Sequence, residues 1–421
     1  MQMRILPRRL SGEVRAVESK SAAHRLLICA ALSDIPTVMR VGSVSADISA
    51  TAACLESLGC SARYGGSVFT VTPVPDTIAH TPVLRCGESG STLRFLLPVV
   101  AAVCDVFAVT GSGRLPQRPL APLMDAMRAN GCSFSAPSLP FEVSGRLVSG
   151  CFELPGDISS QFISGLLMAL PLLHEGGEIR VTGEIQSSGY IDMTLAALAS
   201  FGVETERTSE GWRVGHKGRF SSPGTVEVEG DWSAAAFWLA AGALGGPVAC
   251  KGLDGGSLQK DMRILGLLAA AGAQVSFEDG TATVSEGALK ALRVDAGEIP
   301  DLVPVLAAVL CFARGTSYIE NAGRLRYKES DRLEATAAVL GALGADIRIG
   351  ETGDSLVITG KESLAGGQAD CAGDHRIAMA LAVASCRCLN PVEISRAESV
   401  DKSYPAFFRD FNHLGGRADV V

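Results

Sequence analysis

Several short segments of this chain place lysine, arginine and hydroxyl side chains just before an apolar run. One of them carries Lys20, Ser21 and Arg25 on the first turns of a predicted helix that continues into the apolar residues 26–28. The free N–H groups at a helix N-terminus favour anions, and nearby cations strengthen that preference. The segment is therefore suited to binding phosphate or carboxylate, although a single loop lysine or arginine can equally be a solvated surface residue.

Two further segments have the composition of loops that open helices. The run 86–94, CGESGSTLR, contains Gly90, and its glycines permit an oxyanion to approach the backbone closely. It matches neither a Walker A motif nor a dinucleotide-binding fingerprint. The run 157–162, DISSQF, has two serines and a glutamine that suit a ligand site, and a simple helix N-cap explains it equally well.

Acidic side chains join the basic ones in the second half of the chain. Asp301 stands immediately before a long apolar run. The segment 326–332, RYKESDR, holds Lys328, Glu329 and Arg332. Lysine, glutamate and arginine at this density suit an ion-paired acid in a phosphate site. An acidic first helix turn and a plain charged helix face explain the same residues without a ligand.

The elements that must position these segments follow from an internal repeat. An apolar helical run ends on glycine and is followed by a strand-like stretch six times, at spacings of 72, 71, 70, 72 and 71 residues. Glycine just past a helix supplies the left-handed cap, and the alternating stretches read as strands. Six units of interleaved helices and strands predict an α/β fold and exclude a helical solenoid. The closing glycines are Gly59, Gly131, Gly202, Gly272, Gly344 and Gly415.

If the units share a fold, the loop before the last helix of each unit recurs in space. Asp374, His375 and Arg376 open one further apolar helix, where a lone histidine is more often structural. The residues that stand 12–16 positions before the closing glycines are mostly basic: Asp47, Arg118, Tyr190, Lys260, Lys328 and Lys402.

Composition narrows the classes of protein. The 45 acidic residues exceed the 37 basic ones in 421 residues, which argues against a general nucleic-acid binder and requires any anion site to be concentrated. The uncharged stretch 234–250 is shorter than the ~20 residues that a membrane helix needs and contains Gly-Gly-Pro, so it predicts a buried helix and turn. No secretory signal is recognisable, and we expect a cytoplasmic location.

Cysteine and histidine patterns predict neither disulfides nor a metal site. The twelve cysteines lie in apolar surroundings without a Cys-x-x-Cys pair, and Cys386 and Cys388 are poorly spaced as ligands. The six histidines show no paired spacing. We therefore expect core thiols, including Cys151, and no metal or other cofactor.

In this order, the motifs resemble those of the enolpyruvyl transferases, and most closely the branch that makes 5-enolpyruvylshikimate 3-phosphate. Each motif is common alone, whereas nine in register over nearly the whole chain are specific. They are Ser19–Arg25, Gly87–Arg94, Arg118-Pro119, Ser159–Gln161, Ser187 with Tyr190, the Ile-Pro-Asp ending at Asp301, Lys328–Arg332, Asp374–Arg376 and Lys402.

The resemblance implies two domains, each an inside-out α/β bundle of three βαβαββ units, with the active site between them. Domain I would combine residues 1–18 with 230–421, domain II would span 19–229, and the crossing would lie near Glu18 and residues 229–231. The implied partners are phosphoenolpyruvate and shikimate 3-phosphate, with no nucleic acid or membrane, and the implied state is a monomer. Because cations are divided between the halves, we expect the empty enzyme to open and anions to close it.

The implied reaction transfers the enolpyruvyl group of phosphoenolpyruvate to the 5-hydroxyl of shikimate 3-phosphate through a tetrahedral intermediate. Such a reaction needs an acid and a base beside anionic ligands. By resemblance, Asp301 is the base toward the hydroxyl, and Glu329 and Lys20 take part in proton transfer at phosphoenolpyruvate. The implied shikimate 3-phosphate ligands are Lys20, Ser21, Arg25, Ser159, Ser160, Gln161, Ser187, Asp301 and Lys328. The implied phosphoenolpyruvate ligands are Lys20, Gly90, Arg118, Gln161, Arg332, Arg376 and Lys402.

The sequence departs from the family pattern at a few positions, and two alternative functions remain to be weighed. Val17 and Glu18 replace the usual Pro-Gly, and Glu88 replaces the usual asparagine, where a carboxylate would repel the ligand unless paired or protonated. Gly90 predicts sensitivity to glyphosate, which occupies the phosphoenolpyruvate site in this family. One rival is the same transfer to UDP-N-acetylglucosamine, whose enzymes usually carry a cysteine in the loop that corresponds to residues 111–122, where none is present. A non-catalytic anion-binding repeat protein is the other rival, and the carboxylates Asp301 and Glu329 argue against it.

Overall fold

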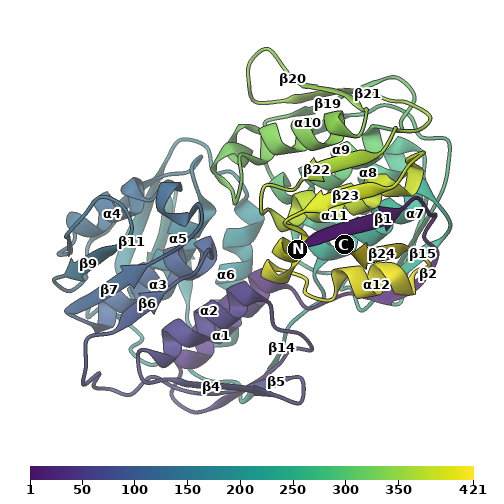
Figure 1. Cartoon of the computed structure of the whole chain (residues 1–421). Coiled ribbons are helices and arrows are strands. Elements are labelled where there is room, and N and C mark those ends of the chain that lie inside the picture. The colour runs from purple at the N-terminus through teal and green to yellow at the C-terminus, as the bar shows by residue number, and fades with distance from the viewer. The chain divides into compact units, whose positions relative to one another are not determined.

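Every strand of the computed structural model, which describes residues 1–421, belongs to one of six four-stranded sheets (Figure 1). Three sheets come from residues 20–228, in the strand orders β14(Thr225–Glu227)-β3(Thr37–Arg40)-β5(Val68–Thr72)-β4(Ser61–Gly65), β6(Val83–Arg85)-β7(Val106–Thr110)-β9(Phe141–Ser144)-β8(Ser133–Phe134) and β10(Cys151–Pro155)-β11(Gly177–Thr182)-β13(Gly211–Val214)-β12(Thr205–Arg207). The other three are β2(Gly12–Arg15)-β15(Val248–Lys251)-β17(Thr281–Ser285)-β16(Gln274–Glu278), β18(Arg293–Asp295)-β19(Thr316–Glu320)-β21(Leu356–Thr359)-β20(Asp346–Ile349) and β22(Gly367–Asp370)-β23(Val392–Ser395)-β1(Gln2–Leu6)-β24(Arg417–Val420).

All six sheets share one pairing pattern. The first two strands are parallel, as β6 and β7 are, and the other two continue the sheet antiparallel, as β9 and β8 do. A parallel pair requires a crossover connection, and in four of the six repeats a single helix joins the two parallel strands, as α3 joins β6 to β7. In the other two repeats the parallel partner comes from a distant part of the chain. The predicted α/β class with six βαβαββ units is therefore confirmed.

The chain divides into two compact units: unit 1 is residues 1–19 with 229–421, and unit 2 is residues 20–228. The two chain passages between the units pair with each other within unit 1. Glu18 forms an antiparallel bridge with Gly230, and the Ser19 N–H donates to the Glu229 carbonyl at 2.7 Å. A Cβ on Gly230 would lie 2.2 Å from the Gly252 carbonyl oxygen, so only glycine fits this crossing.

Three sheets are completed by strands from distant parts of the sequence. In unit 1, β2 pairs parallel with β15 although all of unit 2 separates them in the chain. The N-terminal strand β1 pairs antiparallel with both β23 and β24, and Figure 1 shows it in purple among the yellow C-terminal strands. In unit 2, β14 pairs parallel with β3 although almost the whole unit separates them. Each unit is thus closed by its own last and first segments, which join one repeat.

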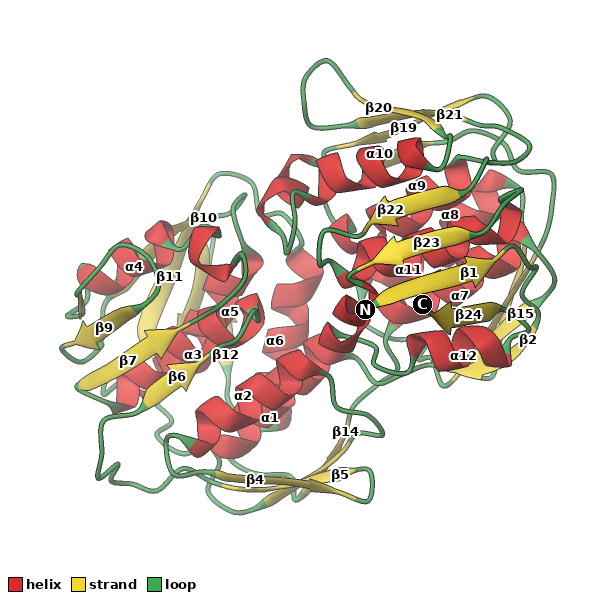
Figure 2. Ribbon diagram, in the orientation of Figure 1, coloured by secondary structure: helices red, strands yellow, loops and turns green.

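The first helix of each repeat forms the interior of its unit. All residues of α7, α9 and α11 are buried, and these three helices pack against one another in unit 1 (Figure 2). A helix that is apolar on all sides has to be buried, which explains the inside-out arrangement with sheets outside. The first helices are α1(Lys20–Ala31), α3(Gly90–Val103), α5(Ser160–Ala169), α7(Trp232–Leu244), α9(Val303–Leu310) and α11(His375–Ala384).

The second helix of each repeat is only partly buried and ends at the repeated glycine. Each of the six closing glycines has a positive φ, between 69° and 103°, which confirms the left-handed cap. These helices are α2(Ala46–Glu56), α4(Ala121–Arg128), α6(Ser188–Ser200), α8(Ile264–Ala271), α10(Arg332–Ala342) and α12(Phe407–His413). Short 3-10 turns are η1(Leu115–Gln117), η2(Leu170–Leu172), η3(Lys260–Arg263), η4(Pro300–Leu302), η5(Gly323–Tyr327), η6(Ser385–Arg387) and η7(Ala397–Lys402).

Two sequence expectations can be compared directly with the core. Residues 234–250 form part of the buried helix α7, a turn and β15, as predicted, and no helix has the length and apolar character that crossing a bilayer requires. All twelve cysteines are free and eleven are buried, but Cys151 is exposed. The expectation of a core thiol is wrong there because Cys151 lies on the outward-facing side of the alternating edge strand β10.

Candidate active site

The guanidinium of Arg332 is the centre of a carboxylate cluster in unit 1. Arg332 is the first residue of α10, and its side chain is 1% exposed. Its Nη1 donates to Asp301 Oδ1 at 2.9 Å and its Nη2 to Glu329 Oε2 at 2.6 Å. Its Nε donates to Asp374 Oδ2 at 2.9 Å. One arginine thus holds three carboxylates from three segments of the chain.

The charges of this cluster stabilise one another. Burial alone lowers the pKa of Arg332, but Asp374, Glu329 and Asp301 outweigh burial and raise it. Burial alone raises the pKa of Asp374, and Arg332 outweighs it so that this pKa is lowered. Both groups are therefore ionised at neutral pH, and the cluster is an ion-pair network rather than a set of neutral acids.

Asp301 also lies next to two further cations. Lys328 Nζ is 3.4 Å from Asp301 Oδ1, and Arg376 Nη2 is 3.3 Å from Asp301 Oδ2. Burial lowers the pKa of Lys328 to about 8 although Asp301 opposes this effect. Lys402, at the end of η7, donates to the Gly373 carbonyl at 2.8 Å and so lies beside the loop that precedes Arg376. All six unit 1 residues proposed from sequence therefore belong to one neighbourhood.

Two unit 1 carboxylates in this neighbourhood were not among the predicted site residues. Asp374 caps α11 by accepting from the Arg376 N–H at 2.9 Å, and it also binds Arg332 and Ser330. The sequence suggests only its capping role. Asp261, on η3, is 5% exposed, and burial together with Asp301 raises its pKa to about 7. The repeat pattern indicated its neighbour Lys260 but not Asp261, because the burial of Asp261 beside Asp301 depends on tertiary packing.

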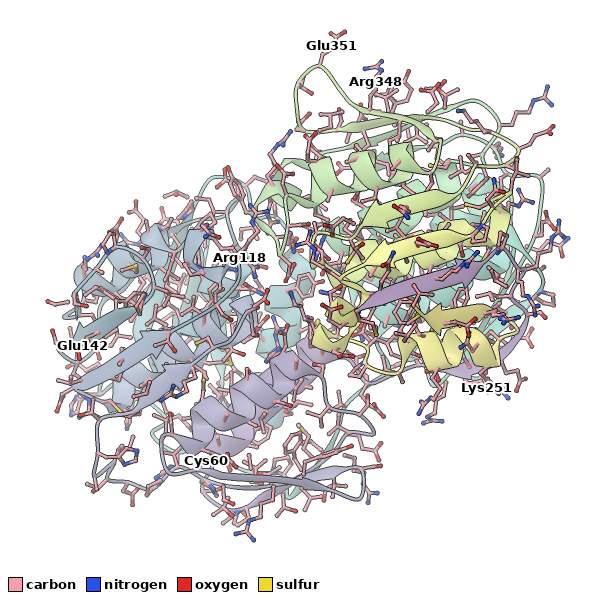
Figure 3. All side chains as sticks on the ribbon, viewed as in Figure 1. Cys60, Arg118, Glu142, Lys251, Arg348 and Glu351 are labelled. Carbon is pink, nitrogen blue, oxygen red and sulfur yellow. The ribbon has the colours of Figure 1, made fainter.

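In unit 2, the glycine-rich loop ends at the N-terminus of α3, where Arg118 lies against it. Ser89 caps α3 by accepting from the Thr92 N–H at 3.2 Å. A Cβ on Gly90 would lie 2.6 Å from Nη1 of Arg118, which is labelled in Figure 3. Glycine at this position thus lets a guanidinium reach the first turn of the helix, where the free N–H groups favour an anion. Glu88 is exposed, and its carboxylate lies against Gly113.

A hydrogen-bonded chain of side chains joins α3 to the start of α5. Arg94 Nη1 donates to Gln161 Oε1 at 2.8 Å, and Gln161 Nε2 donates to Ser91 Oγ at 2.9 Å. Ser159 caps α5 by accepting from the Gln161 N–H at 3.3 Å, and Ser160 is buried as its first residue. The capping explanation and a ligand site are compatible here, because Gln161 bridges two elements that each carry predicted ligands. Arg94 was quoted within a motif but not predicted as a site residue.

The N-terminal turns of α1 contain the remaining cations of unit 2. Lys20 Nζ is 2.9 Å from Asp47 Oδ2, and both side chains are largely buried. Arg25 donates to Thr194 Oγ1 at 2.7 Å and to the carbonyls of Ser21 and Tyr190 at 2.6 and 2.8 Å. Burial lowers the pKa of Arg25 to about 10, so it is a cation among neutral oxygens at neutral pH.

Ser187 precedes α6, whose first turn lies next to Arg25. Its backbone is left-handed, with φ 57° and ψ 46°, and its side chain makes no capping bond to the helix. A non-glycine residue in this conformation is uncommon and is found where the surrounding structure or a function requires it. The unit 2 residues proposed from sequence therefore lie at the N-terminal ends of α1, α3, α5 and α6 and in the loop between β7 and α4. No group of three or more histidine, cysteine, aspartate or glutamate side chains is arranged to hold a metal ion.

Comparison with known proteins identifies the family of this chain. The sequence matches the family described as EPSP synthase (3-phosphoshikimate 1-carboxyvinyltransferase) over residues 6–411, and the chain belongs to that family. Among curated relatives, the 3-phosphoshikimate 1-carboxyvinyltransferases of Clostridium kluyveri and Clostridium acetobutylicum are each 40% identical, covering 99% and 98% of this chain and 97% of each relative.

Solved structures agree with the fold. EPSP synthase from Acinetobacter baumannii matches with a TM-score of 0.80 at 23% identity, over 100% of both chains. The enolpyruvyl transferase NikO from Streptomyces tendae matches with a TM-score of 0.79 at 19% identity, over 99% of this chain and 98% of that one. The family resemblance predicted from the motifs is confirmed.

Proposed function

We propose that this protein transfers the enolpyruvyl group of phosphoenolpyruvate to the 5-hydroxyl of shikimate 3-phosphate and releases phosphate. Membership of the EPSP synthase family, with about 40% identity to relatives named 3-phosphoshikimate 1-carboxyvinyltransferase, supports this reaction. The observation that carries the chemistry is the cluster in which Arg332 binds Asp301, Glu329 and Asp374. An acid–base reaction on anionic substrates needs carboxylates that are held among cations.

In the proposed mechanism, Asp301 accepts the proton of the 5-hydroxyl as the oxygen attacks C2 of phosphoenolpyruvate. The Asp301 side chain is 13% exposed, which leaves room for a substrate hydroxyl to approach it. Protonation of the C3 methylene accompanies the attack and gives the tetrahedral intermediate. Glu329 and Lys20 take part in this second transfer. Loss of phosphate and of one C3 proton from the intermediate regenerates the enol ether, and the same groups serve in reverse.

Binding is assigned to two groups of cations. Arginine suits this role because its planar fork binds carboxylate and phosphate in a bidentate manner. The proposed phosphoenolpyruvate ligands are Lys20, Gly90, Arg118, Gln161, Arg332, Arg376 and Lys402. The proposed shikimate 3-phosphate ligands are Lys20, Ser21, Arg25, Ser159, Ser160, Gln161, Ser187, Asp301 and Lys328.

The proposal takes unit 1 and unit 2 as the two domains of this family and requires both to act on the same pair of substrates. Lys20 and Arg118 belong to unit 2, whereas Asp301 and Arg332 belong to unit 1. Repulsion between the two sets of cations would keep the empty enzyme open, and the anionic substrates would draw the units together and exclude water. Small-angle scattering should record compaction when both substrates are added, and an unchanged radius of gyration would argue against closure.

The reaction is tested by phosphate release from phosphoenolpyruvate with three acceptor arms in chelator-treated buffer. The arms contain shikimate 3-phosphate, UDP-N-acetylglucosamine or no acceptor. We expect release only with shikimate 3-phosphate, and ³¹P NMR should identify the enol ether product. Release with UDP-N-acetylglucosamine would reassign the acceptor. If a folded sample releases no phosphate in any of the three arms, the proposed reaction is contradicted.

A further inference from the structure

A cavity lies in unit 1, beyond the C-terminal end of α11. The cavity has a volume of about 720 Å³, within the range of small-molecule sites, and residues 386–388, which follow α11, form part of its wall. Asp374 and Arg376 of the candidate active site lie at the other end of the same helix. A ten-residue helix is roughly 15 Å long, so the cavity is separate from the carboxylate cluster.

The wall of the cavity is strongly cationic. Arg9, Arg314, Lys361 and Arg387 line it, against a single lining carboxylate, Glu362. Even with the adjacent carboxylate of Glu286 included, four cations face two anions. The chain as a whole carries a formal charge of −8, so this local excess of positive charge runs against the overall composition.

Only two of the four cations are paired with a carboxylate. Arg9 Nη1 is 2.9 Å from Glu286 Oε2, and the other oxygen of Glu286 pairs with Arg387, so one carboxylate fixes two guanidinium groups. Lys361 Nζ donates to the neutral carbonyl of Gly344 at 2.7 Å. The Arg314 side chain has no hydrogen-bond or ion-pair partner within the protein. At least two full positive charges are therefore available to a ligand.

The remaining wall is neutral and partly apolar. Leu289 and Phe312 contribute apolar side chains that are 7% and 6% exposed. Burial raises the pKa of the Cys386 and Cys388 thiols to about 12, so they add no negative charge. The wall also includes Ser363, whose hydroxyl makes no hydrogen bond within the protein.

We propose that this cavity, the α11 C-terminal pocket, binds a small organic phosphate. A phosphate dianion matches the surplus charge of Arg314 and Lys361, and an apolar body on the phosphate would pack against Phe312 and Leu289. The site does not depend on the proposed reaction, because none of its residues is assigned to catalysis or substrate binding.

Calorimetric titration with phenyl phosphate, inorganic phosphate and phenol tests whether the pocket recognises both the phosphate group and the apolar group of the ligand. Phenyl phosphate should bind about tenfold or more tightly than either of the other probes, because only it offers both features. The double variant Arg314→Gln/Lys361→Gln should weaken this binding event about tenfold or more, since it removes the cations available to the phosphate. The Arg314 side chain has no hydrogen-bond partner within the protein, and Lys361 loses only its bond to the Gly344 carbonyl, so circular dichroism should give a nearly unchanged melting curve.

The matched control is Arg348→Gln in the same unit. Arg348 lies on β20, is exposed and extends from the molecule in Figure 3. We expect its variant to bind phenyl phosphate as the wild type does. Binding at the candidate active site would persist in both variants. Equal affinities and stoichiometries in the wild type, the double variant and the control would therefore overturn the proposal.

Discussion

In unit 1 the guanidinium of Arg332 hydrogen-bonds to three carboxylates, whereas in unit 2 the guanidinium of Arg25 hydrogen-bonds only to hydroxyl and carbonyl oxygens. A cation balanced by carboxylates organises groups that can exchange protons, but its charge is already compensated. A cation among neutral dipoles keeps its full charge for a ligand. This difference supports the proposed roles, in which acid–base chemistry lies mainly in unit 1 and anion binding mainly in unit 2.

Lys20 is the instructive exception in unit 2. Its ammonium group is paired with the carboxylate of Asp47 at 2.9 Å. It is also the one unit 2 residue to which the family resemblance gives a part in proton transfer. Whether a cation is paired with a carboxylate or with neutral oxygens therefore correlates better with its proposed role than with the unit in which it lies.

The largest effect should come from breaking the carboxylate cluster itself. Arg332→Met leaves Asp301, Glu329 and Asp374 without their shared cation, and uncompensated buried charge costs about 3–5 kcal/mol. Urea unfolding should report this loss, together with loss of turnover. Arg348→Met, which removes an exposed arginine from the same unit, should change stability by less than about 0.5 kcal/mol. A fully stable Arg332→Met protein would mean that the cluster is not an ion-pair network.

Glu329→Gln sharpens the comparison between the two units, because it keeps the shape of the side chain and removes one proposed proton-transfer group from unit 1. A positioned acid or base contributes about 10²–10⁴-fold to rate, so kcat should fall within that range while the KM values change little. Asp346→Asn on the exposed edge of β20 is the matched control. A fall in kcat of less than threefold would remove Glu329 from the proton-transfer chemistry.

Arg25→Met should show the opposite signature in unit 2. Its partners are neutral, so the stability cost should be about 1–3 kcal/mol, smaller than for Arg332. The KM for shikimate 3-phosphate should rise about tenfold or more, with kcat within about threefold, because a binding cation is lost. Steady-state kinetics distinguish the two signatures. A large fall in kcat with an unchanged KM would reverse the assignment of Arg25.

The smallest predicted effect is a pH dependence from Lys328. Its folded-state pKa of about 8 lies below the ordinary value of 10.5, so the folded protein loses this cation as pH rises through about 8 while the unfolded chain keeps its proton. The free energy of unfolding should therefore increase as pH rises from about 8 to 10.5, because over this range the unfolded state binds more protons than the folded state. Shikimate 3-phosphate binding should weaken over the same range. Lys328→Arg should flatten the KM profile, and an unchanged profile in this variant would exclude Lys328 as its cause.

Local sequence signals predicted most of the fold but not the pairing of strands that are far apart in the chain. The six closing glycines and the alternating strands carry their own physical signatures, in left-handed caps and two-residue periodicity. Strands β1 and β14 complete sheets with partners far away in the chain, and nothing within their few residues indicates the partner. Long-range pairing of short strands depends on the assembled core.

For the candidate site, the sequence indicated which charges gather but not how they pair. The motifs contain the cations that the structure brings together around Asp301. The second role of Asp374, as a partner of Arg332, and the burial of Asp261 beside Asp301 depend on tertiary packing. The pairing of Lys20 with Asp47 joins two helices and is likewise invisible in either segment alone.

The central claim is that the Asp301 carboxylate acts as a base in addition to binding shikimate 3-phosphate, and Asp301→Asn, which keeps an oxygen that can accept a hydrogen bond, tests it most directly. Calorimetry should give an affinity for shikimate 3-phosphate within about threefold of wild type, while phosphate release falls by about 10³-fold, as expected for loss of a general base. Turnover within tenfold of wild type, or a loss of affinity that matches the loss of turnover, would contradict the claim.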